Sequence, residues 1–441
     1  MPRTLTALAV LVAAGAAPAA DNYPAFRGDG NGRAEAKNLP VEWSPKALAW
    51  KVKLPGYGQS SPVVHGGKVF VTAVEGPNKE KNLVAAYDLA TGKELWKAEL
   101  PATQTVKSSF SVARAAPTPV ADAQGLYVFF ESGELARLTH DGKTEWLRSL
   151  VKEFGPIKNG HQLGSSLAQT DDLVFALVDH EGPSYLLAAD KKTGMDRWKV
   201  DRPSRISWTS PVVLRHGGKA LVLVSSGGSV DVYDAATGQV LSTYAGVKNN
   251  NVPSATAEGD RVVVGASDPP RGGDRETTLK SCCCLALDAE GKLSSKPLWH
   301  SEKATASFAS PLIYRGCVYY LNTVGVLACL DLKTGKEHYS ERTPGGCWAS
   351  PVAAGDRVYL FGRNGVTTVV RAGPKFERLA TNRLWDEAKG PAADAYQGDR
   401  KEKGPGAMAA MFGDPILYGV ALVDGLILAR SGTELFAVKA R

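Results

Sequence analysis

Cysteines are the first residues in this chain of 441 whose type and spacing could perform chemistry. Three are consecutive, Cys282-Cys283-Cys284, whereas Cys317, Cys329 and Cys347 stand apart. No two are spaced as C-x-x-C, so zinc ribbons, thioredoxin-like exchange and c-type haem attachment all lack their motif. Two adjacent cysteines could close a strained disulfide ring. Alternatively, the three are small apolar residues of a buried strand.

Carboxylates are the second group with chemical potential. Glu75, Glu131, Asp179 and Glu181 lie on or near predicted strand connections. A carboxylate there could act as a general base toward a hydroxyl, or supply one of the about six to eight oxygen ligands that calcium takes. None of the four shows the local Asp, Asn or Glu spacing of a calcium loop, so the sequence alone indicates ordinary loop acids.

Cationic, amide and aromatic residues form a third group, which stands just before a recurring Ser-Pro or a related dipeptide. The members are Tyr57, Gln59, Arg114, Lys158, His161, Arg205, Trp208, Asn249, Asn250, Phe308 and Trp348. If these positions surround one opening, they form a cationic and aromatic funnel that attracts carboxylates or an acidic peptide. Alternatively, the aromatic members wedge between structural repeats.

A short motif that recurs roughly every fifty residues indicates the elements that must position these groups. Its first copy runs from Tyr87 to Trp96 with the sequence YDLATGKELW, and shortened copies begin at Asp141 and Asp288. We interpret the residues that recur in each copy as turn and packing residues, with glycine supplying a positive φ. They are Asp88, Gly92 and Trp96; Asp190, Gly194 and Trp198; Asp234 and Gly238; and Asp331 and Gly335.

A second marker, Ser-Pro or a relative, precedes each motif and counts the repeats. Its copies begin at Ser61, Thr118, Ser166, Ser210, Ser254, Ser310 and Ser350, with a degenerate copy at Tyr418. Each repeat contains four apolar or alternating runs that fit antiparallel strands, here called A to D in chain order. Eight such repeats predict an all-β, eight-bladed propeller of four-stranded blades.

The two ends of the repeat array predict how the ring closes. The last repeat stops after its third strand, 434–439, and the run 48–53 around Trp50 supplies the missing fourth strand. Pairing these two would bury both sheet edges. The propeller is thus expected to span 48–441 after a lead-in segment, 20–47. Long surface loops are expected near 267–280 and 386–408.

The first nineteen residues are expected to be a cleavable signal peptide. Arg3 precedes an apolar run, and Ala17-Pro18-Ala19 supplies the cleavage site. No cysteine lies near that site, so we expect a periplasmic or secreted protein without a lipid anchor. The net charge of +7 is interspersed along the chain. Without a basic helix or an RNA-binding motif, this charge does not indicate nucleic-acid binding.

The motif Ala-x-Asp-x-x-Thr-Gly-Lys-x-x-Trp resembles the blade motif of the pyrroloquinoline-quinone-like (PQQ-like) β-propellers. The lead-in from Tyr23 to Gly32 resembles the start of exported bacterial members. One branch of this superfamily comprises quinoprotein dehydrogenases, which hold PQQ and calcium and place a disulfide of adjacent cysteines against the cofactor. The other branch resembles the non-catalytic BamB scaffold of outer-membrane β-barrel assembly, which presents loops to partner proteins.

We expect a non-catalytic binding module that needs no cofactor, has no transmembrane segment and is monomeric. Its partner is expected to be a protein or envelope component, bound at the channel mouth through Arg114, His161, Arg205, Trp208, Asn250 and Trp348. The alternative is a PQQ- and calcium-dependent dehydrogenase of alcohols or sugars. A carbohydrate-binding or lyase-like propeller is a third class, but this rim lacks the clustered tyrosine, histidine and acid that such chemistry needs.

Overall fold

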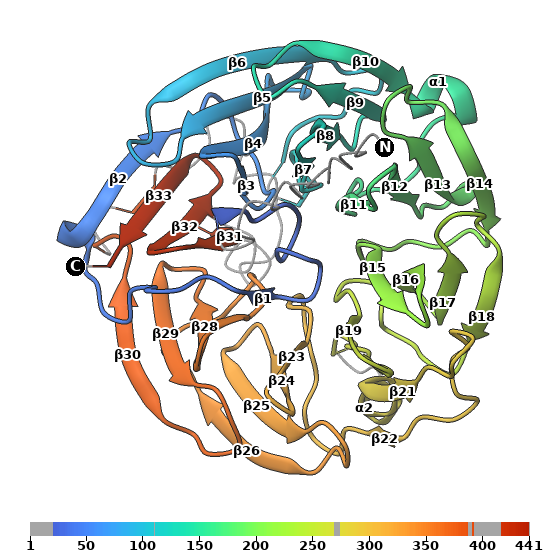
Figure 1. Cartoon of the computed structure of the whole chain (residues 1–441), viewed down its shortest axis with the longest axis vertical. Coiled ribbons are helices and arrows are strands. Elements are labelled where there is room, and N and C mark those ends of the chain that lie inside the picture. The colour runs from blue at the N-terminus through green and yellow to red at the C-terminus, as the bar shows by residue number, and fades with distance from the viewer. Residues whose placement is uncertain (1–20, 110, 269–273, 387–389, 392–415, 441) are drawn as a thin grey trace, which may run out of the picture.

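The computed structural model describes residues 21–109, 111–268, 274–386, 390–391 and 416–440. Its strands form eight sheets arranged around a central axis (Figure 1). The predicted eight-bladed, all-β propeller is therefore confirmed. Within each blade the strands follow one another as an antiparallel meander from the axis outward.

Blades 1 to 4 consist of sixteen strands in chain order. They are β3 (Val63–His65), β4 (Lys68–Glu75), β5 (Lys81–Asp88) and β6 (Glu94–Pro101); β7 (Val120–Asp122), β8 (Gly125–Phe129), β9 (Glu134–Leu138) and β10 (Thr144–Ser149); β11 (Ala168–Gln169), β12 (Leu173–Val178), β13 (Ser184–Asp190) and β14 (Asp196–Arg202); and β15 (Val212–His216), β16 (Lys219–Ser226), β17 (Ser229–Asp234) and β18 (Val240–Tyr244).

Blades 5 to 8 complete the ring, and two N-terminal strands join the last two. They are β19 (Thr256–Glu258), β20 (Arg261–Val263), β21 (Cys283–Ala286) and β22 (Trp299–His300); β23 (Leu312–Tyr314), β24 (Cys317–Leu321), β25 (Val326–Asp331) and β26 (Glu337–Arg342); β27 (Val352–Ala354), β28 (Arg357–Phe361), β29 (Val366–Arg371) and β30 (Arg378–Arg383), with β1 (Arg33–Ala34); and β31 (Leu417–Val423), β32 (Leu426–Ser431) and β33 (Glu434–Lys439), with β2 (Leu48–Lys53).

Helices are few in the described part of the chain. They are the 3-10 turn η2 (Pro45–Ala47), α1 (Leu150–Phe154) and α2 (Arg275–Ser281). Helix α2 lies within the connection that we expected to be a loop. Asp274 is its N-cap, because the Asp274 carboxylate accepts the backbone N–H of Thr277. Among the described residues, no helix is long and apolar enough to cross a membrane.

The hydrophobic core lies between blades rather than within them. Along β5, Val84 and Ala86 pack toward blade 2, whereas Ala85 and Tyr87 pack toward blade 8. This division follows from the period of two along a strand, which sends successive side chains to opposite faces. The central strands are therefore buried almost without interruption, as in β5, whereas the outer strands alternate, as in β6.

The recurring Asp-x-x-Thr-Gly phrase forms the turn between strands C and D. In the first copy, Asp88 Oδ1 accepts the backbone N–H of Thr91 at 2.8 Å and its hydroxyl at 2.6 Å. These hydrogen bonds hold the pKa of Asp88 below its usual value, and the bond from the Thr91 hydroxyl has the largest effect. The same bonds recur in the other full copies, at Asp190, Asp234 and Asp331.

The tryptophan of each motif latches its blade to the next blade. The Trp198 indole N–H donates to the carbonyl of Ala235 in blade 4 at 3.0 Å, and the ring covers Gly238. A Cβ at Gly238 would lie 2.6 Å from that ring, and its φ of +74° also favours glycine. Equivalent indole bonds leave Trp50, Trp96, Trp146 and Trp299.

The Ser-Pro marker forms a second ring of contacts close to the axis. The backbone N–H of each marker residue donates to the hydroxyl of the next blade's marker, at 2.9–3.0 Å. This hydroxyl belt runs through Ser61, Thr118, Ser166, Ser210, Ser254, Ser310 and Ser350. A side chain that is small and carries an acceptor is therefore required at each position.

Ring closure follows the sequence prediction. Strand β2 pairs antiparallel with β33, with Trp50 opposite Ala437, and the Lys51 amine pairs with the Glu434 carboxylate at 2.9 Å. Strand β1, which we did not predict, adds a fifth strand to blade 7 by pairing in parallel with β27. The predicted signal peptide and most of the predicted 386–408 loop lie outside the described residues.

Candidate functional site

A cavity of about 530 Å³ lies at the centre of the propeller, lined by residues from the axial ends of many blades. Members of the hydroxyl belt line the deeper part of this cavity. Toward the face that carries the loops between strands B and C, its walls are formed by Gln59, His161, Trp208, Phe308, Trp348 and Tyr418. We call this face the channel mouth, and the face with the Thr-Gly turns the turn face.

The other end of the channel is closed by the N-terminal segment, which we call the plug (residues 23–34). Its backbone bonds to blade 1 through Tyr23 and Val64 at 2.9 Å, and to blade 7 through Gly32, whose carbonyl accepts the Ala353 N–H at 2.8 Å. Phe26 from the plug lines the cavity. The central cavity is therefore a funnel with a floor rather than an open pore (Figure 1).

A buried arginine holds the plug in place. The Arg27 guanidinium donates to the carbonyls of Asn31 and Pro311, at 3.1 and 2.6 Å, and to the Thr256 hydroxyl at 2.8 Å. Burial lowers the pKa of Arg27 to about 10. Sequence reasoning treated this segment only as a lead-in, although the glycines at alternate positions 28, 30 and 32 signalled close backbone approach.

Two of the six residues predicted to bind a partner at the mouth have buried side chains. Arg114 is only 1% exposed, and its guanidinium lies 3.3 Å from the centre of the Tyr57 ring. Asn250 is fully buried, and its amide bonds Ser225, Ser226 and Ser229 while its oxygen accepts the Gly228 N–H. The Asn250 amide therefore braces the loops of blade 4, whereas the Arg114 guanidinium stacks on the Tyr57 ring.

Arg205 lies at the channel mouth but does not line the cavity. Its guanidinium donates to the Ser229 hydroxyl at 2.7 Å and to backbone carbonyls of the same loops. Lys158 is exposed in the neighbouring connection. The cations that were expected to line the funnel thus lie at its rim, and the cavity walls consist of other residue types.

The aromatic members of the prediction do come together around the cavity. The His161 ring lies 6.0 Å from Trp208, whose indole N–H donates to the Gln162 carbonyl at 2.8 Å. On the far wall the Trp348 ring lies 4.7 Å from Phe308 and 6.3 Å from Tyr418. All line the cavity, so the aromatic residues face the channel rather than serving only as wedges between blades. Tyr418 was missed as a site residue because its marker copy is degenerate.

The four carboxylates considered for catalysis and calcium do not line the central cavity. The Glu131 carboxylate pairs with the buried Lys79 amine at 3.1 Å, and Asp179 pairs with Arg202 at 2.9 Å. Glu75 and Glu181 lie exposed on the outside of their loops. Among the described residues, no group of three or more His, Cys, Asp or Glu side chains is placed to hold a metal.

The three consecutive cysteines are free thiols in the interior of blade 5. Cys283 packs toward blade 4, whereas Cys282 and Cys284 pack toward blade 6. Burial raises the pKa of Cys282 to about 11 and that of Cys284 to about 12, so neither is an activated nucleophile. They follow the alternative interpretation as small strand residues, and none of the three lines the cavity.

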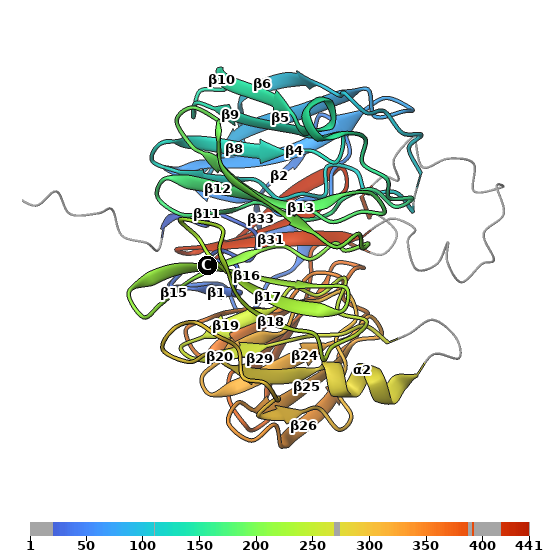
Figure 2. The same cartoon turned by 90° about the vertical axis from the view of Figure 1, so that its right-hand side faces the viewer.

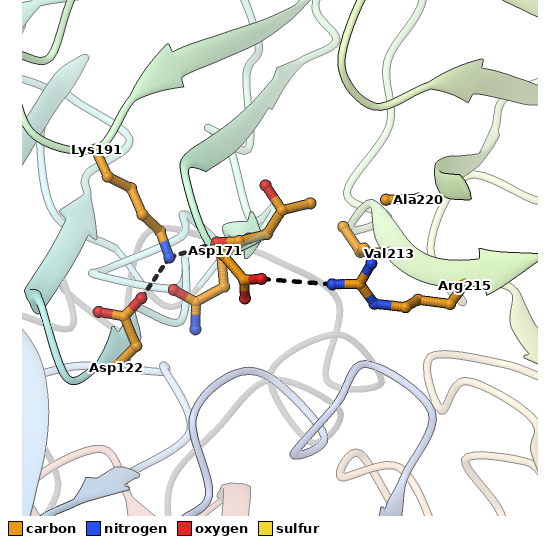
Figure 3. Close-up of a pocket in the computed structure, with 8 residues that line it drawn as sticks. Asp122, Asp171, Lys191, Val213, Arg215 and Ala220 are labelled. Carbon is orange, nitrogen blue, oxygen red and sulfur yellow. Dashed lines mark hydrogen bonds and ion pairs between the residues drawn. The ribbon is translucent and has the colours of Figure 1, made fainter. Parts of the chain in front are cut away.

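A smaller cavity of about 190 Å³ lies on the turn face between blades 2, 3 and 4 (Figure 3). The buried Lys191 amine crosses it to the Asp122 carboxylate and the Thr170 carbonyl, both at 2.5 Å. At its outer edge Arg215 pairs with Asp171 at 3.5 Å. These charges neutralise one another, so this cavity is a structural joint between blades.

Solved structures with the same fold include both branches of the superfamily. BamB from Moraxella catarrhalis is 13% identical over 88% of this chain and 96% of its own, with a TM-score of 0.58. Quinohemoprotein alcohol dehydrogenase from Comamonas testosteroni is 13% identical over 96% of this chain and 81% of its own, with a TM-score of 0.59. At such identity these similarities show the fold alone.

Comparison with curated protein sequences gave no match. The family model described as outer membrane protein assembly factor BamB does match, over residues 33–182 and 283–433. The first range begins in the plug at β1, and the second begins at the cysteine strand β21 and ends within blade 8. Because the two ranges together make up more than half of the chain, this protein belongs to the BamB family of PQQ-like propellers.

Proposed function

We propose that this chain is an exported, non-catalytic propeller that binds protein or envelope partners through its channel mouth. The observation that carries this proposal is the asymmetry of the two faces. The turn face is built from near-identical Asp-x-x-Thr-Gly turns, and its axial opening is closed by the plug. The mouth combines a cavity, aromatic walls and loops that differ from blade to blade.

Variety among loops on a rigid scaffold is what a binding face requires. The mouth offers one exposed cation, Lys158. It also offers an apolar side chain, Val324, which is 58% exposed in the B–C loop of blade 6. The family description, an assembly factor of the outer membrane, supports a scaffold in the cell envelope. Export by the predicted signal peptide is part of this proposal, and no cofactor is expected.

Site-specific photocrosslinking tests which face binds. A benzoylphenylalanine placed at Lys158 or Val324 should capture discrete partners in envelope extract. The matched controls are Lys93 and Lys336, exposed on the turn face. Crosslinks formed only from Lys93 and Lys336 would show that the wrong face has been chosen.

The competing dehydrogenase hypothesis is tested with purified protein reconstituted with PQQ and calcium. We expect no dye-linked oxidation of alcohols or sugars, because Glu131 and Asp179 are held by buried cations. Oxidation that is lost on Glu75→Gln or Glu131→Gln substitution would overturn the non-catalytic assignment.

A further inference from the structure

The walls of the central cavity carry no formal charge in the part of the chain that the structure describes. None of the described lining residues is Asp, Glu, Lys or Arg. The two arginines expected there lie elsewhere, Arg114 beneath Tyr57 and Arg205 against Ser229. The cavity and its rim therefore differ in chemistry, with a cationic outer edge around a neutral interior.

The interior combines apolar surface with hydroxyl groups at different depths. Trp208, Trp348 and Phe308 form the upper walls, and Phe26 of the plug forms the floor. Between them lies the hydroxyl belt. From Thr118 to Ser350, each belt hydroxyl accepts one backbone N–H from the neighbouring blade, which leaves its own O–H group able to donate.

This arrangement discriminates by charge. A carboxylate or an ammonium entering the cavity would lose hydration without gaining an ion pair, which disfavours its binding. An aromatic side chain would instead bury apolar surface against rings, and a neutral carbonyl beside it could accept from the belt hydroxyls. The volume of about 530 Å³ lies within the range of small ligand sites and accommodates one or two side chains.

We propose that the cavity receives an uncharged, aromatic-containing segment of a polypeptide partner. The proposal rests on the proposed function and names the chemistry of the partner at that same site. A polypeptide is favoured because the cavity opens among the mouth loops, where residues flanking the inserted side chain meet the exposed apolar side chain of Val324. The inserted aromatic side chain would act as the buried anchor of the interface.

Three synthetic hexapeptides provide the probe. All share capped ends, serine and glycine flanks and a central 5-fluorotryptophan, and they differ only in the residue beside that ring, which is leucine, aspartate or lysine. Binding to the full mature chain is followed by fluorine NMR titration and calorimetry. The neutral peptide should bind at least about tenfold more tightly than either charged peptide, a difference of about 1.4 kcal/mol.

Variants locate the binding within the cavity. Ala116→Trp fills the cavity from the start of blade 2, and Val252→Trp fills it from the start of blade 5. Both should abolish binding of the neutral peptide, and using two walls guards against one variant misfolding. Arg205→Ala is the matched control, because it alters the rim without touching the lining, and it should bind as the parent does.

Each other outcome overturns the proposal. Tighter binding of the aspartate peptide, weakened by Arg205→Ala, would indicate an acidic partner held by the rim. Equal binding of all three peptides, binding unaffected by Ala116→Trp and Val252→Trp, or no saturable binding would show that the cavity is not the site. In those cases photocrosslinks from Lys158 and Val324 would still support a partner at the channel mouth, so the two proposals can fail separately.

Discussion

At the scale of single residues, the same motif serves a local and a long-range purpose. The Asp and Thr of each copy form their turn by themselves, through hydrogen bonds within four residues. The Trp acts between blades, because its indole N–H finds an acceptor about forty residues further along the chain, as from Trp198 to Ala235. Stability therefore depends strongly on a side chain that covers a glycine in the next blade.

We predict that Trp198→Ala lowers the free energy of unfolding by about 2–4 kcal/mol, because it removes buried ring surface and the indole bond together. Gly238→Ala should be similarly harmful, since the new Cβ would meet the same ring. Urea denaturation measures both. Met195→Ala is the control, because this side chain is 70% exposed in the adjoining turn. Equal stability of Trp198→Ala and Met195→Ala would contradict the latch.

His180 makes the mouth loops sensitive to acid. Its Nδ1 accepts the N–H groups of Lys158 and Gly182 at 3.0 and 3.1 Å, and burial lowers the pKa of His180. Neutral His180 thus contributes stability that is present above the unfolded-state pKa of about 6.5 and is lost as the pH falls through the lowered folded-state value.

The free energy of unfolding should therefore decrease as the pH falls below about 6.5 toward the lowered folded-state pKa of His180. In His180→Gln this decrease should be smaller, at the cost of lower stability at neutral pH. The exposed His300 offers the matched control, His300→Gln, which should keep the parent's pH dependence. Denaturation curves at several pH values measure the effect. An unchanged pH dependence in His180→Gln would remove His180 as the cause.

At the scale of elements, the two N-terminal strands have different tasks. Strand β2 completes blade 8 and closes the ring, whereas the plug that ends in β1 crosses the axis and gives the cavity its floor. Figure 1 shows β2 beside β33 at the outer edge of blade 8, and Figure 2 shows the ring of blades from the side. Ring closure and channel closure are therefore separable.

Deleting residues 21–53 should leave the edge of β33 unpaired and give an insoluble product. Deleting only 21–34 removes the plug and keeps β2, so this shorter deletion should stay soluble with reduced stability. Soluble yield and size-exclusion chromatography compare the two. A soluble, monomeric product of the 21–53 deletion would refute closure by β2.

At the scale of the whole molecule, no blade has a core of its own. Each interior cluster combines residues of neighbouring blades, and both the tryptophan latches and the hydroxyl belt run from blade to blade. A repeat array without closure would behave as a chain of nearest-neighbour units. Closing it into a ring adds the contacts of the seam and should make the blades unfold together.

We therefore predict a single unfolding transition in urea. Tryptophan fluorescence and far-ultraviolet circular dichroism should give coincident curves for the parent protein. Trp50→Ala, which weakens the latch at the seam, should separate the two curves, whereas Trp146→Ala in the middle of the array should only shift them together. Separate transitions in the parent would show that the blades are independent.

The sequence by itself determined the fold, because the features that define it are local and repeated. The turn from Asp88 to Gly92 predicts its own geometry, the Ser-Pro markers count the blades, and the incomplete last repeat predicts that Trp50 closes the ring. Even Trp208 and Trp348 were placed near the axis from their position before a marker.

Only the tertiary structure decided which of these neighbouring positions line the cavity. A side chain's direction depends on the loops packed around it, so Arg114 lies beneath Tyr57 and Asn250 points into blade 4, whereas His161 faces the channel. The floor depended on contacts between Arg27 and Pro311, 284 residues apart. No local pattern reports such a contact. Nor does one report that the walls of the funnel, expected to be cationic, contain no Asp, Glu, Lys or Arg among the residues that the structure describes.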